Sequence, residues 1–423
     1  MVTLEDCYIV IPIFASPTRH SRHKDNSLSI LYVKPPNKPS EIRTFNHLDN
    51  LEAGTLDDLM NVPMITPNKK DLLSVYPFPK VYDASLIWYY LTGNDLDLSN
   101  IRINCLDVMY NKHYSIENIN VVIPLLKHKE YCDAVATKIE SFYLLLKDEQ
   151  LSSYVEYNNN AILALYSIER VGLNVHPQVV ELFGTKVEKH ISEDKMYTDY
   201  FLCTSAGRPS NSFGGINFAA LEPKKRTFII AQNDYLMECD YDAYHVRILG
   251  DLIGYKFPKT SVHEHLRQYY GNVTYDESKA MSFKYLYGNI PAQIGEINPF
   301  FRGVKDLSDL LWTNFNSDGF IETPIYKRRF LKQNYTDMSA NKLLNYYIQA
   351  TETERNIRTI LEIQRYLYKK RTSLILYNYD SFLFDVDEKE NVTLDLVQIL
   401  QQEGFIMKAK TGNNFGDMNE INI

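Results

Sequence analysis

After Thr204, short apolar runs typical of β-strands alternate with longer patterns typical of helices, and this alternation restricts the fold most. The strand-like runs are RTFII (226–230), LILY (374–377) and FLFDV (382–386), and the helical patterns cover 276–287 and 340–368. A chain of 423 residues, 45% of them hydrophobic, can bury large cores. We therefore expect two or three domains, the last of which combines strands and helices.

The first part of the chain has a different pattern. Up to about Asn120, strand-like YIVIPIF and LSILYV precede a helical pattern, DASLIWYYL, and apolar residues recur at helical spacing from Val121 to about Arg170. The sequence predicts an α/β domain over 1–120, a helical segment over 121–200 and a larger domain over 201–423. The apolar run at 8–14 is short and contains Pro12, so we expect a strand, no membrane segment and a cytoplasmic protein.

Charge and cysteine content exclude little. The net charge of −8 argues against a uniformly basic nucleic-acid surface, but the basic clusters at 224–226 and 327–329 could line a groove. The five cysteines have no CxxC spacing, which predicts buried thiols without disulfides or zinc.

Two acidic residues stand at positions that suit metal binding. Asp240 follows an apolar run and precedes a helical pattern, where an Asp taken alone is more often a helix N-cap. Asp380 lies in the polar turn between LILY and FLFDV, where an Asp is ordinarily a turn former. Two such carboxylates, if they meet, can hold two divalent cations for phosphoryl transfer.

A third element is DESKAMSFKYLYG (276–288). On a helix, Lys279, Phe283 and Tyr287 share one face. This face suits a nucleotide, because the ammonium can meet phosphates and the rings can meet sugar and base. The alternative, a Lys that extends past two packed aromatic side chains, has about equal weight by itself.

These three stretches, in this order, resemble motifs A, B and C of family A DNA polymerases, the polymerase I group. Motif A is matched at Asp240, Tyr241 and Arg247, motif B at Lys279, Phe283, Tyr287 and Gly288, and motif C at Asp380 alone. Colinear matches outside the motifs are Arg208 in a Thr-x-x-Gly-Arg segment, Asn217, His263, the basic residues Arg328 and Arg329, and Asn345 with Gln349.

The resemblance implies an α+β right-hand fold with a palm, fingers over about 255–325 and a reduced thumb. It implies a template-directed DNA polymerase that adds dNTPs to a primer-template DNA, with two Mg²⁺ ions as cofactors. Asp240, Asp380 and the Tyr241 backbone would bind the metal ions, and Lys279 would act in catalysis with the two acids. The incoming nucleotide would meet His263, Phe283, Tyr287, His245 and Arg247, and the DNA would meet Arg208, Asn217, Asn345, Gln349, Arg328 and Arg329.

The sequence also departs from the family pattern. His245 replaces the motif A Glu that blocks the ribose 2′-OH, Tyr379 and Ser381 replace the motif C His and Glu, and Tyr275 replaces an Arg. Only 28 residues lie between Val175 and Thr204, where the family has its thumb, so the thumb is nearly absent or the preceding helices replace it.

The N-terminal strand carries no acid where a proofreading exonuclease needs one. The first domain is therefore either an inactive, RNase H-like exonuclease relic or an unrelated domain, and we expect no proofreading. A processivity factor or a separate exonuclease would then be a partner, and the AT-rich coding that the composition indicates favours a phage or similar element.

Two other functions stay open. Single-subunit phage RNA polymerases share the motif B pattern and carry Asp-Ser in motif C, as here. A catalytically silent DNA-binding replisome protein descended from a polymerase is suggested by the lost Glu, the lost Arg and the missing thumb. Incorporation of dNTPs or NTPs on a primed template separates the three.

Overall fold

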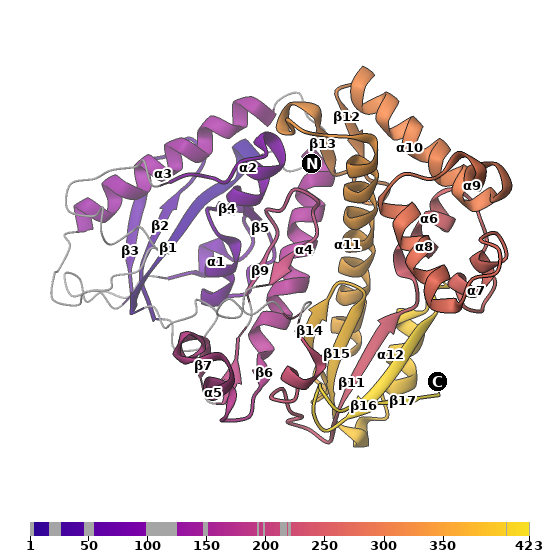
Figure 1. The fold of residues 1–423 in the computed structure, drawn as a ribbon. Helices are drawn as coiled ribbons and strands as arrows, with labels where there is room; N and C mark the ends of the chain where they lie inside the picture. The colour runs from indigo at the N-terminus through magenta and orange to yellow at the C-terminus, as the bar shows by residue number, and fades with distance from the viewer. Residues whose placement is uncertain are drawn as a thin grey trace. The chain divides into compact units, whose positions relative to one another are not determined.

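The computed structural model describes residues 4–16, 27–45, 55–98, 125–146, 151–192, 194–197, 199–211, 218, 221–402 and 404–422. The chain forms two compact units, Met1–Tyr166 and Ser167–Ile423 (Figure 1). The domain borders that the sequence predicts near residues 120 and 200 stay predictions, and the first of them lies outside the described residues. Among the described residues, no helix combines the length and apolar character needed to cross a membrane.

The first unit is built on a five-stranded mixed sheet in the order β3-β2-β1-β4-β5. Its strands are β1 (Tyr8–Ser16), β2 (Ser27–Lys34), β3 (Glu41–Thr44), β4 (Met64–Thr66) and β5 (Val81–Asp83). The first three form an antiparallel meander, and β4 and β5 continue the sheet parallel to β1. The apolar runs YIVIPIF and LSILYV thus form strands, as the sequence predicts, and they are adjacent in the sheet.

Helices cover both faces of this sheet. They are α1 (Lys69–Val75), α2 (Ala84–Thr92) and α3 (Leu125–Leu146), while α4 (Leu151–Val171) spans the border between the units. Side chains alternate along a strand, so Ile9, Ile11 and Ile13 point to one face and Val10 to the other. The isoleucines pack with α2 and α3, and Val10 packs with Leu72 of α1. The helix α3 is therefore part of this core.

A buried polar cluster connects α1, β5 and α4. The Asp83 carboxylate accepts hydrogen bonds from the backbone N–H groups of Lys69 (2.7 Å) and Leu86 (2.8 Å), and the second of these bonds caps α2. The Lys69 ammonium donates to the Asn159 carbonyl at 3.2 Å. Burial lowers the pKa of Lys69 to about 7 and raises that of Asp83 to about 6.

The second unit contains an antiparallel sheet in the order β14-β15-β11-β16-β17 (Figure 1). Its strands are β11 (Tyr235–Tyr241), β14 (Ser373–Asn378), β15 (Ser381–Val386), β16 (Met407–Gly412) and β17 (Asn419–Ile421). Asn378 pairs with Ser381, so Tyr379 and Asp380 form a two-residue turn, and Tyr379 has a left-handed φ of 65°. The predicted hairpin with Asp380 at its tip is confirmed.

Helices of the second unit gather around α11 (Ala340–Tyr366), which contacts α6, α8, α10 and α12 (Figure 1). The other helices are α6 (Tyr244–Leu252), α7 (Val262–Arg267), α8 (Tyr275–Tyr287), α9 (Ala292–Ile297), α10 (Pro299–Ser317) and α12 (Thr393–Leu400). A capping box of Thr274 and Glu277 fixes the start of α8. The two long helical patterns of the sequence thus correspond to α8 and α11.

Between α4 and Thr204, the described residues form only short elements. They are β6 (Leu173–Asn174), α5 (Val179–Phe183), the 3-10 helix η3 (Thr185–His190), β7 (Ile191–Ser192), β8 (Lys195–Met196) and β9 (Tyr200–Phe201). The remaining short strands of this unit are β10 (Ser210–Asn211), β12 (Phe320–Glu322) and β13 (Arg329–Leu331).

One predicted strand is wrong. The run RTFII pairs only through isolated bridges, Val175 with Ile229 and Ile230 with Asn414. Phe228 and Ile229 are buried, so the apolar signal came from core packing and not from a β-ladder.

We expect Asp83→Ala to destabilise the first unit by about 3 kcal/mol, because it removes a helix cap and leaves buried N–H groups without an acceptor. Trp88 of α2 stacks on Phe142 with ring centroids 4.5 Å apart, so its fluorescence in a Trp312→Phe background reports unfolding of this unit. Asn68→Ala is the control, since Asn68 caps α1 through one partly exposed bond and should cost about 1 kcal/mol. Equal losses would contradict the assigned role of Asp83.

Candidate active site

A cavity of about 290 Å³ in the second unit brings together residues from β11, the α6–α8 helices, α11, the β14–β15 turn and β16. The predicted residues that line it are Arg208, Asp240, Tyr241, His245, His263, Lys279, Phe283, Tyr287 and Asp380. Residues that the sequence does not single out also line it, among them Asp242, Glu352 and Lys408.

The sheet places Asp240 beside Asp380. Asp240 lies near the end of β11 and pairs with Ser381 of β15, and the Tyr241 N–H donates to the Asp380 carbonyl at 3.0 Å. The interpretation of Asp240 as a helix N-cap is wrong: α6 begins at Tyr244 after Ala243, and no side chain caps it. The carboxylate is therefore available to the cavity.

The surroundings of both acids disfavour their ionised forms. Burial, with the nearby Asp380 and Glu238 charges, raises the pKa of Asp240 to about 7. Burial and then the Glu352 charge raise the pKa of Asp380. A divalent cation would remove this penalty, and carboxylate oxygens are the ligands that Mg²⁺ prefers. In the part of the chain that the structure describes, no three His, Cys, Asp or Glu side chains form a metal-binding group.

The helix α8 turns its Lys–Phe–Tyr face to the cavity. The Phe283 and Tyr287 rings are parallel within 2°, with centroids 6.0 Å apart. The core side of the helix is formed instead by Ser278, Ser282 and Leu286. Lys279 is exposed and makes no ion pair with any described residue. Phe283 and Tyr287 therefore line the cavity and are not part of the buried face of α8.

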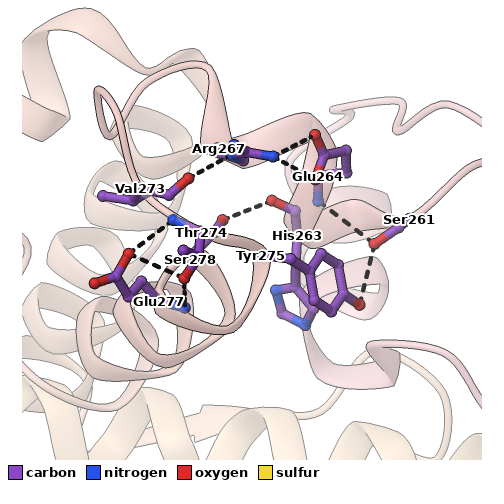
Figure 2. Close-up of polar contacts among 9 residues, drawn as sticks. All are labelled: Ser261, His263, Glu264, Arg267, Val273, Thr274, Tyr275, Glu277 and Ser278. Carbon is purple, nitrogen blue, oxygen red and sulfur yellow. Dashed lines mark hydrogen bonds and ion pairs between the residues drawn. The ribbon is translucent and has the colours of Figure 1, made fainter.

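His263 belongs to α7, and a hydrogen bond holds its backbone to α8 (Figure 2). Its backbone carbonyl accepts a hydrogen bond from Ser278 Oγ at 2.6 Å, and its ring lies 5.5 Å from Phe283 and 6.2 Å from Tyr275. The residue is 2% exposed, and its Nδ1 has no hydrogen-bond partner among the described residues. Burial lowers the pKa of His263, so the imidazole is neutral at neutral pH and can donate one hydrogen bond.

Opposite these groups, a buried carboxylate joins two predicted residues. Glu352 Oε2 lies 3.1 Å from His245 Nε2 and 3.0 Å from Arg208 Nε. His245 Nδ1 lies 2.5 Å from the Tyr287 hydroxyl. The sequence signal for Glu352 was present: it follows Leu344 and Ile348 at intervals of four on the buried side of α11.

Arg247 and Arg328 lie outside the cavity lining and hold backbone in place. Arg247 Nη2 lies 3.3 Å from Asp242 Oδ2 and donates to the Thr260 carbonyl at 3.0 Å. Arg328 is 3% exposed and donates to the Thr204 carbonyl at 3.0 Å. Gly207 has a φ of +74°, and a Cβ there would lie 1.7 Å from Arg328 Nη1, which explains the glycine before Arg208.

The remaining predicted DNA contacts are dispersed. Arg329 pairs with Glu322 at 2.8 Å, and Asn345 and Gln349 are partly exposed on one side of α11. Asn217 lies outside the described residues. Sequence reasoning missed three further charged residues, Asp242, Lys408 and Glu238. Lys408 of β16 lies opposite Asp240 of β11 in the sheet, and Glu238 accepts a hydrogen bond from Ser381 Oγ at 3.0 Å. Alternating charges on strands 238–242 and 408–410 were the signal for them.

Comparison with known proteins identifies the fold. A solved structure described as the POL domain of Pol1 from M. smegmatis, in complex with DNA primer-template and dNTP, matches with a TM-score of 0.65 over 98% of this chain and 96% of that chain. The two sequences are 13% identical, so the likeness concerns the fold. No protein-family model matches the sequence, and no curated protein does. The predicted α+β, polymerase I-like fold is confirmed, and the residue roles stay predictions.

We expect Asp240→Asn to stabilise the metal-free protein at pH 8. Folding raises the pKa of Asp240 from 3.8 to about 7, so the folded state binds the proton more tightly and ionisation above pH 7 costs stability. The gain should shrink as the pH falls toward 4. Mg²⁺ should raise the melting temperature of the unchanged protein but hardly that of the variant.

Melting temperatures in EDTA and in Mg²⁺ test this, with Asp306→Asn on the exposed side of α10 as the control. Equal Mg²⁺ stabilisation of the unchanged protein and both variants would remove Asp240 from the metal site.

Proposed function

We propose that this protein is a template-directed DNA polymerase that adds dNTPs to a primer 3′-OH by two-metal phosphoryl transfer, without proofreading. One observation carries the proposal: the Asp240 and Asp380 carboxylates and the Lys279–Phe283–Tyr287 face line the same cavity. The fold supports it, since the structure of similar fold is described with DNA primer-template and dNTP.

Asp240 and Asp380 would hold two Mg²⁺ ions, with the Tyr241 backbone as a further ligand. When bound, these ions supply activation of the primer 3′-OH and charge neutralisation on the triphosphate. The reaction forms a bond between the 3′ oxygen and the α-phosphorus and releases pyrophosphate.

The protein's own side chains position the nucleotide. The Lys279 ammonium and the neutral His263, which both line the cavity, would meet the triphosphate. The parallel Phe283 and Tyr287 rings would meet base and sugar. Arg247 acts one step away, because it orients Asp242.

The primer-template would contact Arg208, Asn345 and Gln349, with Arg329 and Asn217 as further contacts. Arg328 would serve by holding the segment before Arg208 rather than by reaching DNA, since it is buried. The Arg208 guanidinium carbon lies 3.6 Å from the centroid of the Tyr379 ring, which stands where the family has its primer-positioning His.

We propose that the first unit is an inactive, RNase H-like exonuclease relic. The antiparallel meander that continues into parallel strands supports this, and β1 carries no acidic residue. The thumb is reduced: the short elements between Val175 and Thr204 are too small for it, and α3 belongs to the core of the first unit. The enzyme would be of the phage type and would act together with a processivity factor or a separate exonuclease. It would act in the cytoplasm, which is the host cytoplasm if a phage encodes it.

A single-subunit RNA polymerase is the second candidate, favoured by Ser381 directly after Asp380. A silent replisome protein is the third. Primer extension with Mg²⁺ and either dNTPs or NTPs decides: preference for dNTPs supports the proposal, preference for NTPs supports the second candidate, and no extension supports the third.

Asp240→Ala and Asp380→Ala should each lower the extension rate by more than a hundredfold, a barrier increase of about 3 kcal/mol, while DNA binding stays measurable. The reason is that the metal ions serve chemistry more than duplex affinity. Single-turnover extension and a filter-binding assay measure the two effects. Ser381→Ala, next to Asp380, is the control and should stay active; more than a hundredth of the rate in either Asp variant would refute the metal assignment.

The purified protein should not shorten a labelled single-stranded DNA from its 3′ end in Mg²⁺, because two-metal hydrolysis requires clustered carboxylates. Gel analysis of the labelled strand measures this. Shortening that persists in the Asp240→Ala variant would place a nuclease outside the polymerase site and overturn the proposal of an inactive first unit.

A further inference from the structure

Glu352 occupies a position that ordinary packing does not favour. Its side chain is 1% exposed in the middle of α11, yet burial of an ionised carboxylate is costly unless it is paired. Two partners offset this cost: His245 Nε2 at 3.1 Å and Arg208, through Nε at 3.0 Å and Nη2 at 3.3 Å. Burial raises the pKa of Glu352, but the His245 and Arg208 contacts outweigh it and leave the pKa below its usual value.

The partners of Glu352 connect both sides of the cavity. On the side of α8, His245 Nδ1 lies 2.5 Å from the Tyr287 hydroxyl. On the hairpin side, the Arg208 guanidinium lies over the Tyr379 ring, one residue before Asp380. Glu352 is therefore the common partner of the group that faces the nucleotide sugar and the group that faces the primer end.

The carboxylate also determines the hydrogen-bond roles of His245. An ionised carboxylate only accepts, and at 3.1 Å its charge favours the tautomer in which Nε2 of His245 carries the hydrogen, although the two atoms are not aligned as a hydrogen bond. In the neutral imidazole, Nδ1 is then an acceptor and takes the Tyr287 hydroxyl hydrogen. The orientation of the Tyr287 hydroxyl thus depends on the charge of Glu352, which acts through His245.

We propose that Glu352 is a positioning residue for sugar selection: it fixes the His245 ring and its tautomer, and through His245 it fixes Tyr287 as the wall beside the 2′ carbon of the incoming nucleotide. The proposal rests on the proposed polymerase function. The family's motif A places the selecting carboxylate at the position of His245; here the carboxylate comes from α11 and acts through the imidazole.

Glu352→Gln tests the proposal with little change in volume. With its oxygen in place of Oε1, the amide keeps the bond from Arg208 Nη2. Its NH₂ group then replaces Oε2, gives up the Arg208 Nε contact and faces His245 Nε2, which becomes an acceptor and reverses the bond to Tyr287. We expect the ratio of NTP to dNTP kcat/KM in single-nucleotide insertion to rise by about tenfold, through the NTP value. His245→Ala should raise the same ratio by about ten- to a hundredfold.

The double variant Glu352→Gln with His245→Ala should show no higher ratio than His245→Ala alone, because both changes break the same chain. Glu354→Gln is the matched control. Glu354 lies two residues along α11, is equally buried and accepts bonds from Thr323 Oγ1 and from the Tyr326 N–H (3.2 Å), away from the cavity. Its variant should leave the ratio unchanged even if it melts earlier.

The outcomes separate the proposal from the function on which it rests. If the unchanged protein incorporates dNTPs and Glu352→Gln lowers NTP and dNTP insertion together with a constant ratio, Glu352 is only structural and the proposal fails. If the unchanged protein inserts no dNTP, or uses NTPs equally well, the proposed function itself fails. Should Glu352→Gln not fold, Tyr287→Phe removes the contact between the Tyr287 hydroxyl and His245 instead. An unchanged NTP to dNTP ratio in this variant also overturns the proposal.

Discussion

The antiparallel pairing of β11 with β15 is the constraint on which the site depends. It places Asp240 opposite Ser381 and brings the Tyr241 N–H to the Asp380 carbonyl, although the two acids lie in distant parts of the sequence. A shift of one residue in this register would turn Asp240 to the other face of the sheet. Met237, Cys239 and Tyr241 are buried on the face opposite Asp240, and such a shift would bury charged side chains in their place. Core packing therefore fixes the position of Asp240.

The helix α11 imposes the second constraint, because it buries polar groups that need partners from other elements. Asn356 donates to the Tyr379 carbonyl at 2.6 Å and accepts from the Tyr244 hydroxyl at 2.9 Å, so it holds the β14–β15 hairpin to the start of α6. Glu352 and Glu354 do the same for segments near Arg208 and Thr323. A buried polar network of this kind rigidifies a site only when its members are satisfied together.

Sequence patterns predicted what depends on local periodicity. The helices at Asp276 and Ala340 and the Asp380 hairpin were confirmed, since their signals lie within a single element. Two failures have different causes. Asp240 as a helix cap was wrong because Ala243 occupies the N-cap position, and Glu352 was missed because its partners come from other segments. Motif order located the predicted site residues, but only the fold shows which of them meet in one cavity.

The charges in the cavity are divided in a way that favours a composite ligand. Beside β11 and β15, the partly buried Asp240 and Asp380 carry raised pKa values, because burial and neighbouring negative charges disfavour their ionised forms. On the fingers side, Lys279 has no ion pair within the described residues, and His263 Nδ1 has no partner among them. A metal ion alone would neutralise the two acids, and an anion alone would pair with Lys279 and His263. A nucleoside triphosphate with bound Mg²⁺ would satisfy both, and in the proposed function its base and sugar would cover the parallel rings of Phe283 and Tyr287.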